Sequence, residues 1–244
     1  PSHTPNWHSV IAAFESGGCF HPRTAMGMFE HVREAVERGD VLLEWDFSKG
    51  APDKPLLKDV YGGERRRAKT LNFSIAYGKT VYGLSADWGV DMDEAKQMVS
   101  KWYTGREEVE QWQKRTKAEA RKSGATRTLM GRFRELKGIQ SGAPRLVGHG
   151  ERAAINTPIQ GGAADIMTLA MLKLHQSKEL RDMGYKLLLQ VHDEVILEGP
   201  EEYAQQARDE VVRCMTHPFD EHLTSLLIDL EVDAKTAKTW YGAK

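Results

Sequence analysis

One repeated spacing constrains this chain more than any other feature. Four residues stand four positions apart, namely Arg65, Lys69, Phe73 and Tyr77. The segment that contains them, 64–77, has a helical pattern, and Gly78 is well placed to end it. On an α-helix each step of four residues overshoots a full turn by roughly 40°, so the four side chains form one gently curling stripe about 18 Å long.

The stripe has two cations at its start and two aromatic rings at its end. A nucleoside triphosphate has the same polarity, with anionic phosphates at one end and a flat base at the other. Arginine offers a bidentate fork to phosphate oxygens and lysine a mobile charge, while aromatic rings offer stacking faces. The spacing alone equally allows an ordinary amphipathic helix with Phe73, Ile75 and Tyr77 on its core side.

A second pattern places carboxylates in a turn between two apolar strands. The segment Tyr185–Glu198 predicts two short strands, LLLQV and VIL, on either side of His192, Asp193 and Glu194. Hard oxygen ligands of this kind suit Mg²⁺, and burying them without a partner is costly. An ordinary solvated hairpin turn would have the same composition.

Charge is segregated along the chain, although the formal net charge is only −1. Segment 114–137 holds nine basic residues against two acidic ones, 65–69 forms a second basic cluster, and 193–210 is acidic. Each basic cluster could be a solvated helix face, but together with the acidic turn they favour a phosphate-binding surface next to a metal site.

Composition excludes several other classes of protein. Hydrophobic residues make up 40% of the chain, enough for a sizeable core. Cys19 and Cys214 form no CxxC pair, which argues against a zinc site or a disulfide framework. No apolar run reaches membrane-spanning length, and we expect no membrane partner.

The order of the expected elements predicts an α+β fold. Helices dominate the first part, with Asp91 as the N-cap of one and Pro158 interrupting a long one over 149–176. The two strands come late, followed by an amphipathic helix over 201–215 and a last strand over 228–233. Helices first and a small antiparallel sheet later is not a βαβ pattern.

The helix with the stripe resembles motif B of family A (DNA polymerase I-like) DNA polymerases. Residues 65–78, RRRAKTLNFSIAYG, have every element of that motif at its spacing. The resemblance implies that Arg65 and Lys69 bind the triphosphate of an incoming dNTP, that Phe73 lies against its sugar and that Tyr77 lies near the templating position. The upstream segment CFHPRTA is similar to a histidine-containing segment of the family and adds His21 to the dNTP-binding residues.

The acidic turn resembles motif C of the same family, LLLQVHDEVILEG. The resemblance makes Asp193 a metal ligand and Glu194 a helper carboxylate, and it counts both with Lys69 as catalytic residues. Segment 151–166 is similar to the family's palm helix, and 128–136 to its Thr-Leu-x-Gly-Arg element, with Phe133 where the family often has a second arginine. The DNA-binding residues implied by these segments are Thr128, Arg132, Arg152, Asn156, Gln160, Gln190 and His192.

The resemblance extends over about 6–240 and is strongest to the plant and algal organellar branch, which implies a chloroplast or mitochondrial protein. It implies right-hand polymerase architecture: a mostly helical fingers subdomain over 1–142, with an insertion near 30–59, and the C-terminal part of the palm over 143–244. Primer–template DNA and dNTP would be the partners, and we expect a monomer.

The implied reaction is attack of a primer 3′-hydroxyl on a dNTP with two Mg²⁺ ions. That chemistry needs a second aspartate, which the family carries in motif A. The chain has no such motif, its first aspartate being Asp40. We therefore expect a C-terminal fragment of a polymerase that is inactive alone. The alternatives are a non-catalytic DNA-binding remnant of a polymerase, a nuclease using Asp193 and Glu194, and a helical scaffold.

Overall fold

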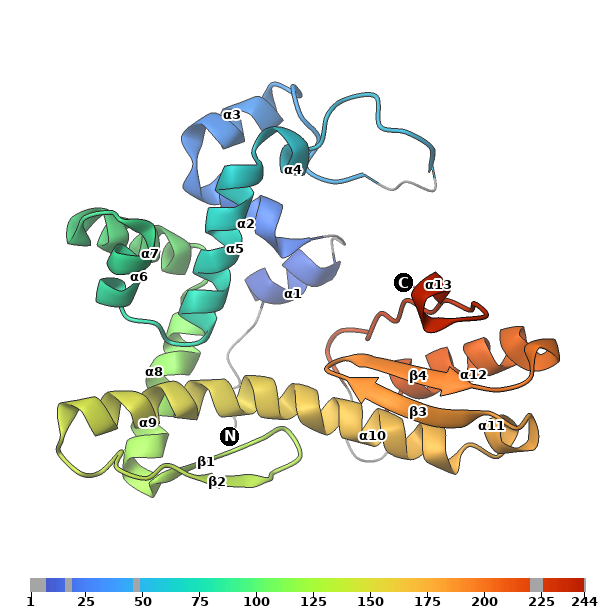
Figure 1. Cartoon of the computed structure of the whole chain (residues 1–244). Coiled ribbons are helices and arrows are strands. Elements are labelled where there is room, and N and C mark those ends of the chain that lie inside the picture. The colour runs from blue at the N-terminus through green and yellow to red at the C-terminus, as the bar shows by residue number, and fades with distance from the viewer. Residues whose placement is uncertain (1–7, 16–18, 46–48, 220–225, 244) are drawn as a thin grey trace. The chain divides into compact units, whose positions relative to one another are not determined.

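A computed structural model describes residues 8–15, 19–45, 49–219 and 226–243 (Figure 1). The chain divides into two compact units. The first comprises Pro1–Arg127 and Phe133–Pro158, and the second comprises Thr128–Arg132 and Ile159–Lys244. These units are defined by contacts within the chain and are not the predicted subdomains, so the predicted boundary between fingers and palm at residue 142 stays a prediction.

The first unit is mostly helical. Its elements in chain order are α1 (His8–Glu15), α2 (Phe20–Met28), α3 (Glu30–Glu37), α4 (Leu57–Val60), α5 (Gly62–Ala76), α6 (Val81–Trp88), α7 (Met92–Thr104), α8 (Glu107–Ser123), β1 (Ala125–Arg127), β2 (Phe133–Glu135) and α9 (Pro144–Asn156). Strands β1 and β2 pair antiparallel. The sequence pattern did not predict this hairpin, because three-residue strands are too short for an alternating pattern.

Helix α5 is the centre of the first unit. Its buried residues Leu71 and Ile75 form a cluster with Leu84 of α6 and Trp102 of α7, and Ala68 belongs to a second cluster with α2, α3 and α4. Figure 1 shows α2 alongside α5. Because apolar residues occupy one side of α5 and neighbouring helices cover that side, the opposite side of the helix is free for polar and aromatic residues.

Local signals explain where several helices begin and end. The Asp91 carboxylate accepts hydrogen bonds from the backbone N–H groups of Asp93 and Glu94, which confirms it as the N-cap of α7. Helix α5 ends at Ala76, and Gly78 follows with a left-handed φ of +70°, as predicted. Leu42 and Leu56 pair as an isolated parallel bridge, so the ends of segment 42–56 lie side by side. The insertion expected near 30–59 stays a prediction.

Helix α9 leads into the second unit through a π-helical turn, Thr157–Gly161. Pro158 lies in this turn and has no N–H to donate, so the regular ladder of hydrogen bonds cannot pass through it. The prediction of a long helix interrupted at Pro158 is therefore confirmed.

The second unit contains α10 (Gly162–Gln176), α11 (Lys178–Asp182), the antiparallel pair β3 (Lys186–Val191) and β4 (Glu194–Glu198), a 3₁₀ turn (Glu201–Tyr203), α12 (Ala204–Thr216) and α13 (Trp240–Ala243). Leu174, Leu180, Ala207 and Cys214 form its core, against which Val195 and Leu197 of β4 pack. Helices with small antiparallel sheets confirm the α+β class.

One predicted element is wrong. The strand expected over 228–233 is irregular backbone in the structure. Alternation of apolar and polar residues produces a strand only where a neighbouring strand accepts its hydrogen bonds. In the described residues the late sheet has two strands, β3 and β4, and both pair with each other.

The cysteines and the length of the helices exclude two kinds of feature in the described residues. Cys19 and Cys214 are free thiols. Among the described residues, every helix is too short or too polar to cross a bilayer.

Candidate functional site

The four residues of the stripe lie on the side of α5 that its neighbours leave open, and we call them the α5 ridge. Lys69 is exposed, Phe73 is 44% exposed, and Arg65 and Tyr77 are half-buried. Lys69 Nζ lies 5.8 Å from the centroid of the Phe73 ring, and the Phe73 and Tyr77 rings stack 6.2 Å apart. The ridge thus runs from cations to stacked rings as the spacing predicted.

Helix α2 brings His21 onto the same surface. Its ring lies 5.6 Å from the Phe73 ring. Partial burial, and then the charges of Arg65 and Lys69, lower the pKa of His21 below its ordinary value of 6.5. The imidazole is therefore neutral at neutral pH, beside two cations.

Arg65 is held at the start of the ridge by the chain that precedes α2. One of its Nη atoms donates to Cys19 Sγ at 3.4 Å. Among the described residues, its buried Nε has no hydrogen-bond partner. The guanidinium therefore keeps hydrogen-bonding capacity that the protein does not use.

Sequence reasoning missed the polar groups beneath the ridge. Asn72 is 7% exposed and bonds to His21, Thr24 and Trp102. Its partners come from two other helices, so no local pattern could identify them. The available signal was a polar residue at position 72 on the side of the helix that Leu71 and Ile75 make apolar.

The acidic turn is a tight two-residue connection between β3 and β4. Val191 pairs with Glu194, which leaves His192 and Asp193 as the turn. His192 has a left-handed φ of +54°, uncommon for any residue but glycine. The Gln190 side chain donates to the backbone carbonyl of His192 and so supports this turn.

Asp193 and Glu194 are both exposed at the turn. Adjacent carboxylates at a hairpin end are hard oxygen donors suited to Mg²⁺. In the part of the chain that the structure describes, no group of three or more His, Cys, Asp or Glu residues could hold a metal. The residues present therefore fit part of a magnesium site, with Asp193 as a ligand and Glu194 beside it.

The predicted DNA-binding residues on the long helix fall in both units. Arg152 and Asn156 belong to α9 in the first unit, and Gln160 belongs to the second. Arg152 and Gln160 are exposed, whereas the Oδ1 atom of Asn156 is buried and, among the described residues, without a hydrogen-bond partner.

Thr128 and Arg132 belong to a loop of the second unit that is tied to α10. Arg132 donates from Nη2 to Asp165 Oδ1 at 2.8 Å, and the backbone N–H of Met130 donates to Asp165 Oδ2 at 3.0 Å. Burial alone would raise the pKa of Asp165, but hydrogen bonds from Thr128, Met130 and Arg132 lower it on balance. The arginine therefore orders its own loop, while its side chain remains 61% exposed.

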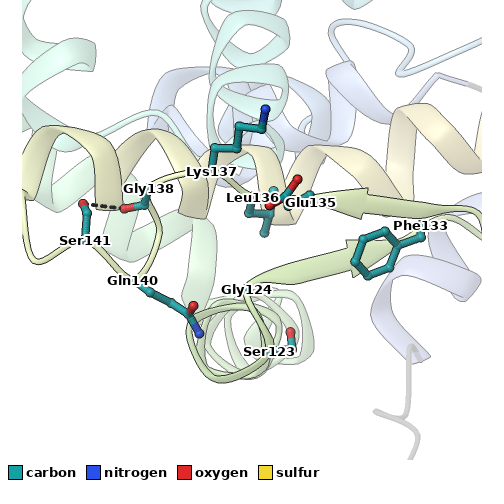
Figure 2. A pocket seen from close by; sticks show the side chains of 9 residues that line it. All are labelled: Ser123, Gly124, Phe133, Glu135, Leu136, Lys137, Gly138, Gln140 and Ser141. Atoms are coloured by element: carbon teal, nitrogen blue, oxygen red, sulfur yellow. Dashed lines mark hydrogen bonds between the residues drawn. The ribbon is translucent and has the colours of Figure 1, made fainter.

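The first unit also has an open hollow of about 600 Å³ between the end of α8, strand β2 and the loop that follows it. Figure 2 shows Phe133, Glu135, Lys137 and Ser141 among its lining residues. It is separate from the α5 ridge in sequence and composition, and its lining has no pair of carboxylates. We assign it no role in the chemistry.

Comparison with known proteins shows the family of the chain. The sequence pattern of DNA polymerase family A matches residues 53–242. The chain belongs to this family.

Relatives of the chain occur in plants and in bacteria. The chain is 53% identical over 245 residues to "DNA polymerase I B, chloroplastic/mitochondrial" of Arabidopsis thaliana, covering 100% of this chain and 23% of that protein. It is 33% identical over 243 residues to "DNA polymerase I, thermostable" of Thermus aquaticus, covering 100% of this chain and 26% of that protein. The greater identity to a plant organellar protein confirms the predicted branch. The chain spans about a quarter of the length of the curated relatives that it matches.

A solved structure has a similar fold. The POL domain of Pol1 from M. smegmatis, in complex with DNA primer–template and dNTP, has a TM-score of 0.73 and 28% identity, covering 94% of this chain and 35% of that one. The predicted family and fold class are confirmed. The roles of the individual site residues stay predictions.

Proposed function

We propose that this chain is the fingers and part of the palm of a DNA-directed DNA polymerase, which transfers a nucleotidyl group from a dNTP to a primer 3′-hydroxyl. The α5 ridge with His21 beside it carries the proposal. In one compact unit it supplies two cations, a neutral imidazole and two stacked rings, in the order that a nucleoside triphosphate requires. Membership of family A and the fold of a polymerase domain support it.

Each residue of the ridge has a separate task in this proposal. Arg65 and Lys69 bind the triphosphate and offset the charge that develops on the leaving pyrophosphate. Phe73 lies against the sugar, and Tyr77 lies near the templating base. The neutral His21 donates a hydrogen bond to a phosphate oxygen, where it adds a donor without a third charge.

Asp193 would hold Mg²⁺ in the complete enzyme, with Glu194 as a helper carboxylate. Two Mg²⁺ ions, when bound, activate the attacking oxygen and stabilise the leaving oxygens. The contribution of this chain is to fix Asp193 at a hairpin whose turn is supported by Gln190. The other carboxylate would come from a strand outside this chain.

The surface of β3 supports the proposal that a further strand supplies the other carboxylate. Leu188, Leu189 and Val191 are 56%, 42% and 37% exposed, which is unusual for three apolar residues of one strand. A two-stranded sheet is also marginal by itself. We propose that further strands of the polymerase cover this sheet and bring the second carboxylate.

The remaining partners follow from the same proposal. Primer–template DNA would be contacted by Thr128, Arg132, Arg152, Asn156, Gln160, Gln190 and His192. We expect the protein to act as a monomer. Its place would be a chloroplast or mitochondrion, which is the location that the names of its plant relatives give for those proteins.

The test is primer extension by the complete polymerase that contains this chain. Asp193→Asn should abolish extension and leave primer–template affinity largely unchanged, because the change removes a metal ligand and keeps the shape of the side chain. Asp182→Asn, at the end of α11, is the matched control and should extend normally. A protein that binds DNA and extends nothing even before substitution would instead be the non-catalytic remnant.

A further inference from the structure

A buried set of hydrogen bonds joins His21 to helices α5 and α7. Asn72 Nδ2 lies 3.0 Å from His21 Nδ1 and donates to Thr24 Oγ1 at 3.1 Å. On the other side of the amide, Trp102 Nε1 donates to Asn72 Oδ1 at 2.7 Å. Asn72, Thr24 and Trp102 are 7%, 2% and 4% exposed, so other protein groups, rather than solvent, supply their hydrogen-bond partners.

Trp102 determines which way the Asn72 amide points. An indole N–H can donate a hydrogen bond and cannot accept one. The amide atom that faces it must therefore be the oxygen, since the reverse orientation would place two donors against each other in a buried site. With Oδ1 turned to Trp102, Nδ2 faces His21. The Thr24 hydroxyl, which can donate or accept, lies 3.1 Å from Nδ2 and 3.2 Å from Oδ1 and is satisfied in this orientation.

The amide in turn determines the tautomer of His21. Nδ2 can only donate, so His21 Nδ1 must accept, which requires it to be unprotonated. The proton of the neutral ring then lies on Nε2. The hydrogen bond made by one ring nitrogen thus sets the protonation of the other, as in other histidine sites.

Arg106 holds two of the side chains that contact the Asn72 amide, Trp102 and Thr24. The guanidinium of Arg106 lies 4.6 Å from the Phe20 ring centroid and 4.7 Å from that of Trp102, and its Nη2 donates to Thr24 Oγ1 at 3.0 Å. Burial lowers the pKa of Arg106 to about 10, so it remains a cation at neutral pH. Arg106 therefore supports both the ring of Trp102 and the hydroxyl of Thr24.

We propose that Asn72 and Trp102 are positioning residues that hold His21 as the neutral tautomer protonated at Nε2. His21 then always offers a donor, and never a lone pair, to the ligand of the α5 ridge. The inference rests on the proposed function insofar as that ligand is the triphosphate of a dNTP. The tautomer itself follows from the contacts within the first unit.

Nitrogen spectroscopy tests the tautomer in the absence of any nucleotide. The protein is labelled with ¹⁵N-histidine, and the ring signals of His21 are assigned by their loss in His21→Gln. The expected spectrum has an unprotonated Nδ1 and a protonated Nε2 at neutral pH. A protonated Nδ1 would overturn the inference, whatever the protein does with nucleotides.

Nucleotide binding tests the consequence through a double-mutant cycle in the complete polymerase. Trp102→Phe keeps an aromatic ring and removes the N–H, so the Asn72 amide can rotate and exchange the positions of its oxygen and nitrogen. We expect dNTP affinity to fall roughly three- to tenfold, the scale of one hydrogen bond. In a His21→Ala background the same change should have no further effect. Trp88→Phe is the matched control, because Trp88 packs on the same cluster outside the network.

Other outcomes separate the two proposals. If His21→Ala weakens dNTP binding and Trp102→Phe weakens it equally in both backgrounds, Trp102 acts through general packing and the inference is wrong. If His21→Ala leaves dNTP affinity unchanged, the proposed role of His21 fails, and the inference about its ligand fails with it. The spectroscopic result stands apart from both, because it does not require a nucleotide.

Discussion

Gly78, two residues past the end of helix α5, lies against Arg152 of α9. A Cβ atom added to Gly78 would be 3.5 Å from Arg152 Cγ and 3.3 Å from Ile155 Cδ1. A residue predicted to bind DNA therefore packs against the end of the proposed dNTP-binding helix, within one compact unit. Without a side chain at position 78, the two helices can approach this closely.

Gly78→Ala should destabilise the protein more than Gly89→Ala. Both glycines have a left-handed φ, +70° and +64°, so each substitution costs about 1–2 kcal/mol of backbone strain. Gly89 has open space around it, whereas an alanine at 78 must also displace Ile155. Urea unfolding of the two variants measures the difference. Equal losses of unfolding free energy in the two variants would show that Ile155 moves aside at no cost.

Phe73→Tyr should ease the incorporation of dideoxynucleotides. The Phe73 ring is exposed on the ridge, and a new hydroxyl there could stand in for the missing 3′-hydroxyl of the sugar. The ratio of dNTP to ddNTP incorporation by the complete polymerase measures the effect. Unchanged selectivity would place Phe73 away from the sugar.

His21 should make the protein less stable as the pH falls below 6.5. Its pKa is lowered by burial and by Arg65 and Lys69, so below 6.5 the unfolded chain binds a proton that the folded chain resists. Stability therefore rises with pH across this window and is lost as the pH falls through it. His21→Gln should flatten the pH dependence of the unfolding free energy between about pH 5 and 7. An unchanged slope would mean that the folded protein accommodates the charged ring.

Glu210 should contribute stability that also rises with pH, but in a lower pH range than His21. Hydrogen bonds from Arg213, and then from Ser177 and Cys214, lower the pKa of Glu210 from an ordinary value of 4.5 to about 2, although burial alone would raise it. The stabilisation is complete above pH 4.5 and is lost as the pH falls toward 2. At neutral pH, Glu210→Gln should cost about 1.5–3 kcal/mol in unfolding free energy. At pH 2 the variant and the wild type should differ little, and a difference that persists there would point to packing.

The sequence allowed the ridge and the acidic hairpin to be predicted because each depends on short-range geometry. A four-residue spacing fixes which residues share a helix face, so the placement of Lys69 and Phe73 follows from position alone. The β3–β4 hairpin follows in the same way from two apolar runs around a turn.

The network under the ridge could not be predicted, because its members are far apart in the chain. Asn72 meets Thr24 48 positions away, and Thr24 meets Arg106 82 positions away. Such contacts depend on how α2, α5 and α7 pack. The incorrect strand over 228–233 has a related cause, since an alternating pattern does not specify a pairing partner.

The most direct measurement of the central claim compares two neighbouring arginines. Arg65 belongs to the ridge, whereas Arg66 is exposed on another side of the same helix. In the complete polymerase, Arg65→Ala should weaken dNTP binding by roughly tenfold or more, the scale of lost charge-assisted hydrogen bonds. Arg66→Ala should change it by less than about twofold, and neither variant should alter the much weaker binding of the nucleoside without phosphates. Equal losses of dNTP affinity in both variants would contradict a specific triphosphate site on this ridge.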